Sequence, residues 1–258
     1  MGRSALPLQD ARLTALMLLT TVVMAMGGKD FCSWKCAVFT QQWPSGFCKS
    51  LINQSDCIIP EAINDWTIHG LWPQTHTESS CDCWPLFRSD IQELEEELMQ
   101  RWPTLVKKHT SFFFWSLEWK RHGSTAACEE GLNSPLRYFQ TSLRLVDKFN
   151  LSSILKKADI TPSCDRPYKV KELHGLLAPS FGEELEIQCV RDEKGRELWY
   201  QVKIPLSRAG FTVGCGNYTW EGQRSNPSPR NQPHPCPAKG SVYLLPINHQ
   251  HPSEPCKH

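Results

Sequence analysis

Two short segments of the chain combine histidine with aromatic, acidic and basic residues. The first, WTIHGLWP, places His69 between two tryptophans, and the second, FWSLEWKRHG, contains Glu118, Arg121 and His122. If the second segment is helical, Glu118 lies three residues before Arg121 and four before His122, so the three side chains share one face. That face would present a carboxylate, a permanent cation and an imidazole beside aromatic rings.

Such a set of side chains is typical of RNA cleavage without a metal. An imidazole titrates at about pH 6.5, so two of them can divide the roles of base and acid. One would remove the 2′-OH proton, the oxygen would attack phosphorus, and the other would protonate the leaving 5′-oxygen. A guanidinium can stabilise the charge that develops on the phosphorane oxygens, and aromatic rings can stack on bases. DNA lacks the 2′-OH and would be inert by this route.

Each segment also has an ordinary structural interpretation. A histidine between tryptophans is often a packed core residue, and Glu118 with Arg121 alone is a solvated ion pair that contributes roughly a few tenths of a kcal/mol. A zinc site is disfavoured, because LEWKRH lacks the paired histidines of an HExxH helix and the cysteines form no CxxC pairs. Spacing alone does not establish that the two segments meet.

The elements that must position these residues are strands and helices in no regular βαβ alternation. We expect strands at 36–43, 184–190 and 197–206, a disulfide-closed loop at 44–57, and helices from 89 to 101, over 113–122 and over 135–149. The last helix has Pro135 in its first turn and an apolar stripe that belongs to the core. This mixture favours an α+β fold.

The two ends of the chain differ in composition from the middle. Residues 1–27 have basic residues, a short apolar run and small residues, the pattern of a secretory signal peptide. The run is too short for a comfortable membrane span, and no later segment could cross a bilayer. From 221 onward Pro, Ser, Asn, Gln and His dominate. We therefore expect a signal peptide at 1–27, a catalytic domain at 28–220 and a Pro-rich tail at 221–258. The tail should have little structure of its own and be anchored by Cys236 and Cys256.

Cysteine usage and charge limit the compartment and the partners. Twelve cysteines and the sequons at Asn53, Asn150 and Asn217 predict a disulfide-bonded glycoprotein that is secreted or resides in the lysosome or the endoplasmic reticulum lumen. With 28 Lys and Arg against 27 Asp and Glu, the net charge is +1, which excludes a polycationic nucleic-acid binder. Any RNA must be held at a local site.

The two segments resemble the active-site segments of the ribonuclease T2 family of acid endoribonucleases. The family patterns are typically WxIHGLWP and FWxHEWxKHGxC, and the first is matched here without departure. QQWP at 41–44 and IQC at 187–189 are also similar, and the resemblance covers about residues 34–236. It implies an α+β fold, an antiparallel sheet flanked by helices and stabilised by disulfides. It further implies cleavage of single-stranded RNA through a 2′,3′-cyclic phosphate without a metal or other cofactor. We expect a monomer.

The resemblance also assigns roles to individual residues. His69 and His122 would be the acid–base pair; we favour His122 as the first base and His69 as the acid, but the assignment stays open. Glu118 and Arg121 would stabilise the phosphorane. The remaining expected contacts to substrate are Trp66, Phe114, Trp115 and Gln42. The family pattern implies disulfides Cys48–Cys57 and Cys189–Cys236, and a pairing of Cys128 with Cys81 or Cys83; the other pairings are left open.

Three departures from the family pattern fall on the second segment. Leu117 replaces a histidine that binds phosphate, Arg121 replaces a lysine, and Thr125 stands where a half-cystine is usual, with Cys128 three residues further. A leucine cannot donate a hydrogen bond, so we expect a reduced rate. These departures motivate an alternative, a secreted protein of the same fold with weakened or lost activity that binds RNA or acts in signalling.

Overall fold

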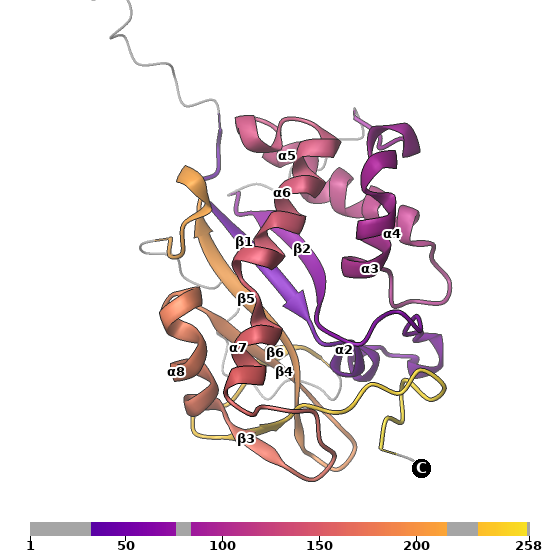
Figure 1. Cartoon of the computed structure of the whole chain (residues 1–258), viewed down its shortest axis with the longest axis vertical. Helices are drawn as coiled ribbons and strands as arrows, with labels where there is room; N and C mark the ends of the chain where they lie inside the picture. Colours follow the sequence, from indigo (N-terminus) through magenta and orange to yellow (C-terminus); the bar gives the residue numbers. More distant parts are fainter. Residues whose placement is uncertain (1–31, 76–83, 216–231, 257–258) are drawn as a thin grey trace, which may run out of the picture. The chain divides into compact units, whose positions relative to one another are not determined.

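The computed structural model describes residues 32–75, 84–215 and 232–256 (Figure 1). The strands in these ranges are β1 (Cys36–Gln42), β2 (Thr67–Pro73), β3 (Pro167–Lys169), β4 (Glu186–Arg191), β5 (Glu197–Ser207), β6 (His234–Pro235) and β7 (Ser241–Tyr243). The α-helices are α2 (Pro44–Ser50), α3 (Glu95–Arg101), α4 (Ser111–Glu118), α5 (Ser124–Ala126), α6 (Pro135–Lys148), α7 (Leu151–Lys157) and α8 (Val170–Phe181). All of them lie in the compact unit Trp34–His258.

The centre of this unit is a sheet with the strand order β2-β1-β5-β4-β6. These neighbours pair antiparallel, while β7 pairs antiparallel with β3 and parallel with β5. Helices α6, α7 and α8 lie along the sheet in Figure 1, and rings of Phe39, Phe149 and Phe181 pack together between β1, the end of α6 and α8. The expected α+β class with a mainly antiparallel sheet is confirmed.

Successive side chains of β1 point to opposite faces of the sheet, as the strand pleat requires. Gln41 is directed to the helical face, where its Nε2 donates to the Phe149 carbonyl at 2.9 Å. Gln42, the next residue, therefore faces the opposite side. That side carries the residues that the two sequence segments predict for the site.

Two predicted segments differ from the structure in detail. Residues 44–57 do not form a simple loop, because Pro44 begins helix α2 and a 3-10 turn follows at Gln54–Asp56. The helix expected from residue 89 starts with two 3-10 turns, Arg88–Asp90 and Gln92–Leu94, and becomes α-helical only in α3. Its end at Arg101 is as predicted.

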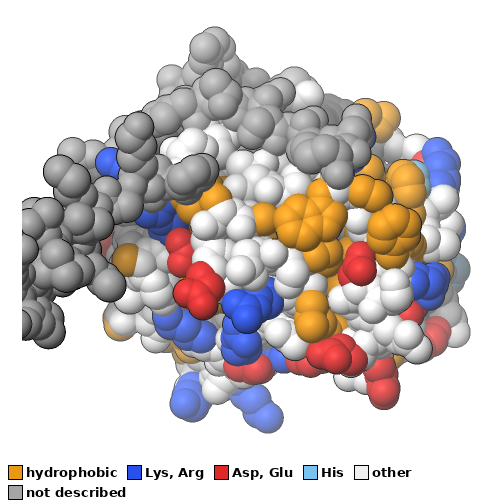
Figure 2. All heavy atoms as spheres, turned by 90° about the horizontal axis from the view of Figure 1, so that it is seen from above, with side chains coloured by type: hydrophobic (Ala, Val, Ile, Leu, Met, Phe, Trp, Pro, Cys, Tyr) orange, Lys and Arg blue, Asp and Glu red, His pale blue; other side chains and the backbone are white. Residues whose placement is uncertain are grey.

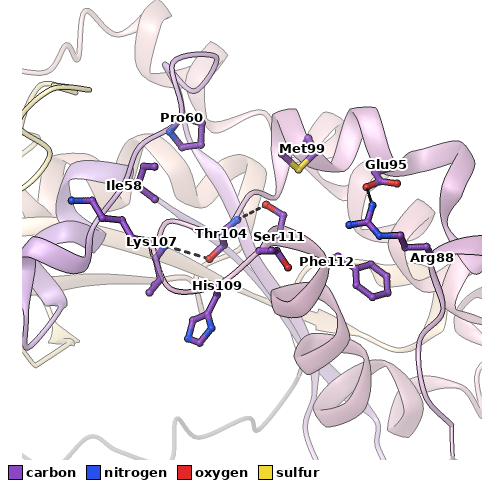
Figure 3. Close-up of a pocket in the computed structure, with 12 residues that line it drawn as sticks. Ile58, Pro60, Arg88, Glu95, Met99, Thr104, Lys107, His109, Ser111 and Phe112 are labelled. Atoms are coloured by element: carbon purple, nitrogen blue, oxygen red, sulfur yellow. Dashed lines mark hydrogen bonds and ion pairs between the residues drawn. The ribbon is translucent and has the colours of Figure 1, made fainter.

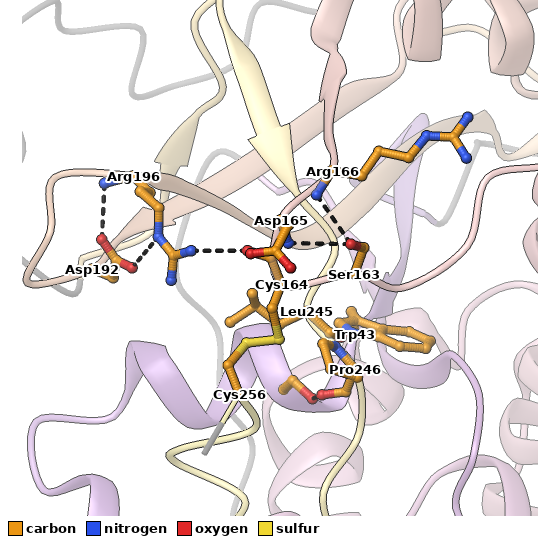
Figure 4. The surroundings of a disulfide bond; sticks show 11 residues. Trp43, Ser163, Cys164, Asp165, Arg166, Asp192, Arg196, Leu245, Pro246 and Cys256 are labelled. Atoms are coloured by element: carbon orange, nitrogen blue, oxygen red, sulfur yellow. Dashed lines mark hydrogen bonds and ion pairs between the residues drawn. A yellow bond between two sulfur atoms is a disulfide. The ribbon is translucent and has the colours of Figure 1, made fainter. Parts of the chain in front are cut away.

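The predicted tail has more structure than expected at residues 232–256, whereas its expected anchoring is confirmed, because Cys236 and Cys256 are both disulfide-bonded. These residues form β6 and β7 and bury Leu244 and Leu245, and the Trp43 indole donates to the Leu245 carbonyl at 2.7 Å. A disulfide joins Cys164 to Cys256, and Arg196 donates to the Cys164 carbonyl beside it (Figure 4). Composition was misleading here because the one short apolar run, VYLLPI at 242–247, is surrounded by polar residues and prolines, and disulfides to other parts of the chain also hold the segment in place.

The disulfides agree with the expected framework where the structure describes them. Cys48–Cys57 and Cys189–Cys236 are confirmed, and Cys36–Cys215 and Cys164–Cys256 are additional pairs that the sequence left open. Cys32 and Cys128 are also disulfide-bonded. Cys81 and Cys83 lie outside the described residues, so the pairing of Cys128 with one of them stays a prediction.

The structure describes only some of the residues on which the expected glycosylation sites and signal peptide lie. Asn53 and Asn150 are exposed, as a glycosylated asparagine must be, whereas Asn217 and the signal peptide at 1–27 lie outside the described residues. Within the described ranges, no helix has the length and apolar character needed to cross a membrane.

Candidate active site

His69 occupies an irregular position in β2. In the pairing with β1, Gly70 faces Thr40 and Ile68 faces Gln41, which leaves His69 as an extra residue without a partner. Such a β-bulge turns a side chain away from the regular alternation, and bulges are common beside active sites. The bulge lets the half-buried imidazole face the site while Ile68 stays fully buried in the core.

The second segment forms a helix whose character changes within the segment. Thr110 caps α4 by accepting from the Phe113 N–H, and the α-helix ends at Glu118, before the predicted 122. Trp119–Gly123 then forms a π-helical turn that carries Arg121 and His122. A π-turn rotates less per residue than an α-turn, so His122 is displaced around the axis relative to Glu118. Turns of this kind often occur at functional sites.

Tryptophan hydrogen bonds tie this helix to β2. The Trp115 indole donates to the Trp102 carbonyl at 2.7 Å, and the Trp102 indole donates to the His69 carbonyl at 3.1 Å. Both indoles are fully buried. The bulge and the helix are therefore held together by rigid rings rather than by flexible side chains.

Trp72 is the common neighbour of the predicted catalytic groups. Its ring centroid lies 5.1 Å from that of His69 and 5.7 Å from that of His122. Its Nε1 donates to Glu118 Oε2 at 3.0 Å. The two imidazoles and the carboxylate thus surround one indole, so the two sequence segments do meet.

The glycines of the two segments make this arrangement possible. A Cβ at Gly70 would lie 2.1 Å from Trp72 Nε1 and 2.5 Å from Glu118 Oε2. A Cβ at Gly123 would lie 2.2 Å from a ring carbon of Trp119. Any larger residue would displace an indole, and at Gly70 it would also displace the Glu118 carboxylate.

Burial controls the protonation of the three groups. It lowers the pKa of His69 to about 4, against a hydrogen bond to Gln201 that raises it. The pKa of His122 is also lowered to about 4, mainly by burial and in addition by the positive charges of Arg121 and His69. The pKa of the buried Glu118 is raised to about 7 by burial, although the Trp72 hydrogen bond and Arg121 act in the opposite direction.

A small cavity of about 80 Å³ opens beside His69. Gln42, Phe114 and Leu117 line it, so three positions that the family pattern singles out lie together with the imidazole. Gln42 is 1% exposed, and its Oε1 has no hydrogen-bond partner within the part of the chain that the structure describes. A buried acceptor without a partner, facing a cavity, indicates a place for a ligand donor.

A second cavity of about 400 Å³ adjoins the first (Figure 3). Thr104, Val106 and His109 line both cavities. The His109 ring is stacked on the exposed Phe113 ring, with centroids 4.8 Å apart. Hydrophobic side chains gather on the side of the molecule where α3 and α4 lie (Figure 2). The surface next to the site therefore offers exposed rings and a hollow continuous with the imidazole.

Two expected lining residues are core residues instead. Trp66 is 7% exposed and packs between Trp43 and Trp199, and the fully buried Trp115 braces α4. Their indoles fill space between elements, and neither of them lines the cavity beside His69. Arg121 is exposed beside Glu118 and His122.

Sequence reasoning missed two residues of the site. Trp72 was identifiable, because it lies in the first segment two residues after Gly70. Gln201 was not, because it lies in a distant strand with no motif; its Oε1 is 2.7 Å from His69 Nδ1. In the described part of the chain, no group of three or more His, Cys, Asp or Glu side chains is placed to hold a metal ion.

Comparisons with known proteins agree on one family. The Ribonuclease T2 family model matches residues 34–218. Ribonuclease Oy from Magallana gigas is 32% identical over 189 residues, covering 70% of this chain and 87% of that protein. The crystal structure of human RNase T2 superimposes with a TM-score of 0.64 at 28% identity, covering 83% of this chain and 99% of that one. RNase NT, solved in complex with 5′-AMP, gives a TM-score of 0.67 at 26% identity with the same coverage.

Proposed function

The chain belongs to the ribonuclease T2 family, and on that premise we propose that it cleaves single-stranded RNA by metal-free transesterification with His69 and His122 as the acid–base pair. The observation that carries the proposal is the position of both imidazoles against Trp72, with Glu118 bonded to the same indole. We further propose that the chain is a glycoprotein that is secreted or resides in the lysosome.

The two imidazoles exchange protons with the two oxygens that change bonding. The base, which we assign to His122, takes the proton of the 2′-OH as that oxygen bonds to phosphorus. The acid, His69, gives its proton to the 5′-oxygen as the P–O5′ bond breaks. A 2′,3′-cyclic phosphate results, and water then opens it with the two roles reversed.

Glu118 and Arg121 act on the charge of the phosphorane. Because the pKa of Glu118 is about 7, its carboxyl is neutral in acid. Glu118 Oε2 accepts a hydrogen bond from Trp72 Nε1. This leaves Oε1 to carry the proton and to donate a hydrogen bond to a phosphorane oxygen. The Arg121 guanidinium adds a positive charge at the exposed side. Leu117 supplies no donor, which is the basis for expecting a reduced rate.

Digestion of RNA in the presence of a chelator tests this proposal. We expect 2′,3′-cyclic phosphate ends and a rate maximum at about pH 4–5, with a decline of about tenfold per pH unit on the alkaline side. The reaction needs one neutral and one protonated imidazole, and both histidines have a pKa of about 4. Above this value both become neutral and the acid is lost. Initial rates across the acid and neutral range measure the profile.

A matched substrate supplies the control for that experiment. An oligonucleotide with one 2′-deoxy nucleotide at the cleaved position should stay intact, since it lacks the attacking oxygen. Cleavage of the deoxy substrate, a rate maximum at or above neutral pH, or complete dependence on added metal would contradict the mechanism.

We also propose that the RNA strand continues from the small cavity into the larger one. Gln42 Oε1 accepts an N–H of a base in the small cavity, and His109 with Phe113 offers the next stacking surface. Lys107 lines the larger cavity and brings positive charge to the backbone of the strand, whereas the charge of Arg88 there is paired with that of Glu95. The site would then bind more than the two nucleotides that flank the cleaved bond.

Substitution Phe113→Ala tests the path of the strand. We expect KM for a longer oligonucleotide to rise about 5–150-fold, because a base stacked on an aromatic ring contributes about 1–3 kcal/mol. KM for a dinucleotide should rise less, because Phe113 also lines the small cavity but only the longer strand reaches the stacking surface beyond it. Phe87→Ala is the matched control, since Phe87 is also exposed but lines neither cavity. Equal effects on short and long substrates would refute the path.

A further inference from the structure

A line of buried amide side chains leads away from His69 across the sheet. Gln201 on β5 and Gln188 on β4 lie directly opposite each other and are 3% and 6% exposed. His69 Nδ1 contacts Gln201 Oε1, Gln201 Nε2 donates to Gln188 Oε1, and Gln188 Nε2 donates to Glu186 Oε1 at 2.6 Å. The line thus connects the imidazole to a carboxylate on the far strand.

The Glu186 carboxylate at the end of the line determines how each amide group is oriented. An ionised carboxylate only accepts hydrogen bonds, and Lys203 Nζ lies 3.4 Å from the same Glu186 oxygen. The amide nitrogen of Gln188 must therefore face Glu186, which turns its oxygen toward Gln201. By the same logic the Gln201 nitrogen faces Gln188 and its oxygen faces His69. The only hydrogen bond that His69 can make there is donation from Nδ1–H.

We propose that Gln201, Gln188 and Glu186 form a positioning relay that holds neutral His69 in its Nδ1–H tautomer and reserves Nε2 for proton transfer. Both roles of His69 need this, because Nε2 must gain a proton in one step and release it in the other. The relay touches no reacting atom, so its members are positioning residues. The effect of the relay on catalysis rests on the proposed function, whereas its hydrogen-bond geometry does not.

The backbone supports the relay at both of its ends. The bulge at His69 directs the imidazole toward β5, and a second irregularity between Gln188 and Cys189 leaves Tyr200 as the extra residue beside Gln201. The Tyr200 ring lies 6.2 Å from that of His69. The imidazole is thus confined by rings while the amide oxygen sets its rotation and its tautomer.

Nitrogen NMR of the full folded chain tests the tautomer directly. With ¹⁵N-labelled histidine at neutral pH, where His69 is uncharged, the shifts should show Nδ1 protonated and Nε2 bare. Gln201→Leu should give a mixture of the two tautomers. A wild-type His69 with its proton on Nε2 would overturn the proposal, whether or not the protein cleaves RNA, so this result is distinct from a failure of the proposed function.

Kinetics test the consequence for catalysis. Gln201→Leu should lower kcat for RNA by about 10²-fold, the effect of a misplaced catalytic group, and leave KM nearly unchanged. The matched control is Gln41→Leu, which removes an equally buried amide from the helical face of the sheet, opposite to the face of His69. This variant should leave kcat unchanged. A folded Gln201→Leu variant with wild-type kcat, or an equal loss in Gln41→Leu, would overturn the positioning role.

Discussion

His122→Ala is expected to lower kcat for RNA cleavage by about 10²–10⁴-fold, the usual contribution of a general acid or base. His122 shares the Trp72 ring with His69, and alanine at this position leaves no group to exchange the proton. KM should change little, because the cavity that receives the base is lined by other residues. Initial rates at the acidic optimum measure the loss.

His174→Ala serves as the control for that result. His174 lies in α8, and its Nε2 contacts the Glu183 carbonyl, so it belongs to neither cavity at the site. Both variants should bind an uncleavable 2′-deoxy oligonucleotide as the wild type does. Full turnover in His122→Ala would refute the catalytic assignment. A biological effect that persists in an inactive His122→Ala variant would instead favour the binding or signalling alternative.

Leu117→His should raise kcat, by as much as about 10²–10³-fold, without a change in the cyclic-phosphate product. Leu117 lines the small cavity together with His69, the proposed acid, so an imidazole there would lie near the cleaved phosphate that His69 contacts and donate a hydrogen bond that leucine cannot make. Leu117→Met is the matched control, because it fills similar volume and supplies no donor. Single-turnover rates separate this effect from product release.

A small increase of kcat in Leu117→His has to be interpreted together with the effect of the neighbouring His109. It lines the same cavity as Leu117. If His109 already donates to the phosphate, Leu117→His should change little and His109→Ala should lower kcat. Unchanged rates in both variants would refute the view that a phosphate donor is missing from this cavity.

Local patterns predicted β1, β4, β5 and α6 for identifiable reasons, whereas β2, α2, α7 and α8 were not predicted. The helix over 135–149 has a cap at Ser134, a proline in its first turn and an apolar stripe, and all of these signals lie within the helix itself. The β4–β5 hairpin has a turn flanked by apolar runs. Where the partner lies elsewhere in the chain, prediction was incomplete: the cysteines of residues 232–256 indicated an anchored segment, but its contacts with Cys164, Trp43 and the sheet do not follow from its own composition.

The sequence pattern likewise did not predict the π-turn after Glu118 or the bulge at His69. Both are irregularities of one residue, and they exist because packed neighbours require them. A spacing of four residues places His122 on the same face as Glu118 in an ideal helix, but the π-turn changes that angle. Only the surrounding tryptophans show why the backbone departs from the regular form.

The two segments around His69, Glu118 and His122 indicated the family and the proposed kind of chemistry, because proton transfer depends on the nature of these groups and their local spacing. The tertiary structure decided the rest: Trp72 brings the three groups together, Gln201 from a distant strand contacts His69, and Trp66 and Trp115 belong to the core. The physical reason is that proximity, burial and the pKa shifts they cause arise from contacts between residues far apart in the chain. Such contacts depend on sheet register and packing, and no local pattern specifies them.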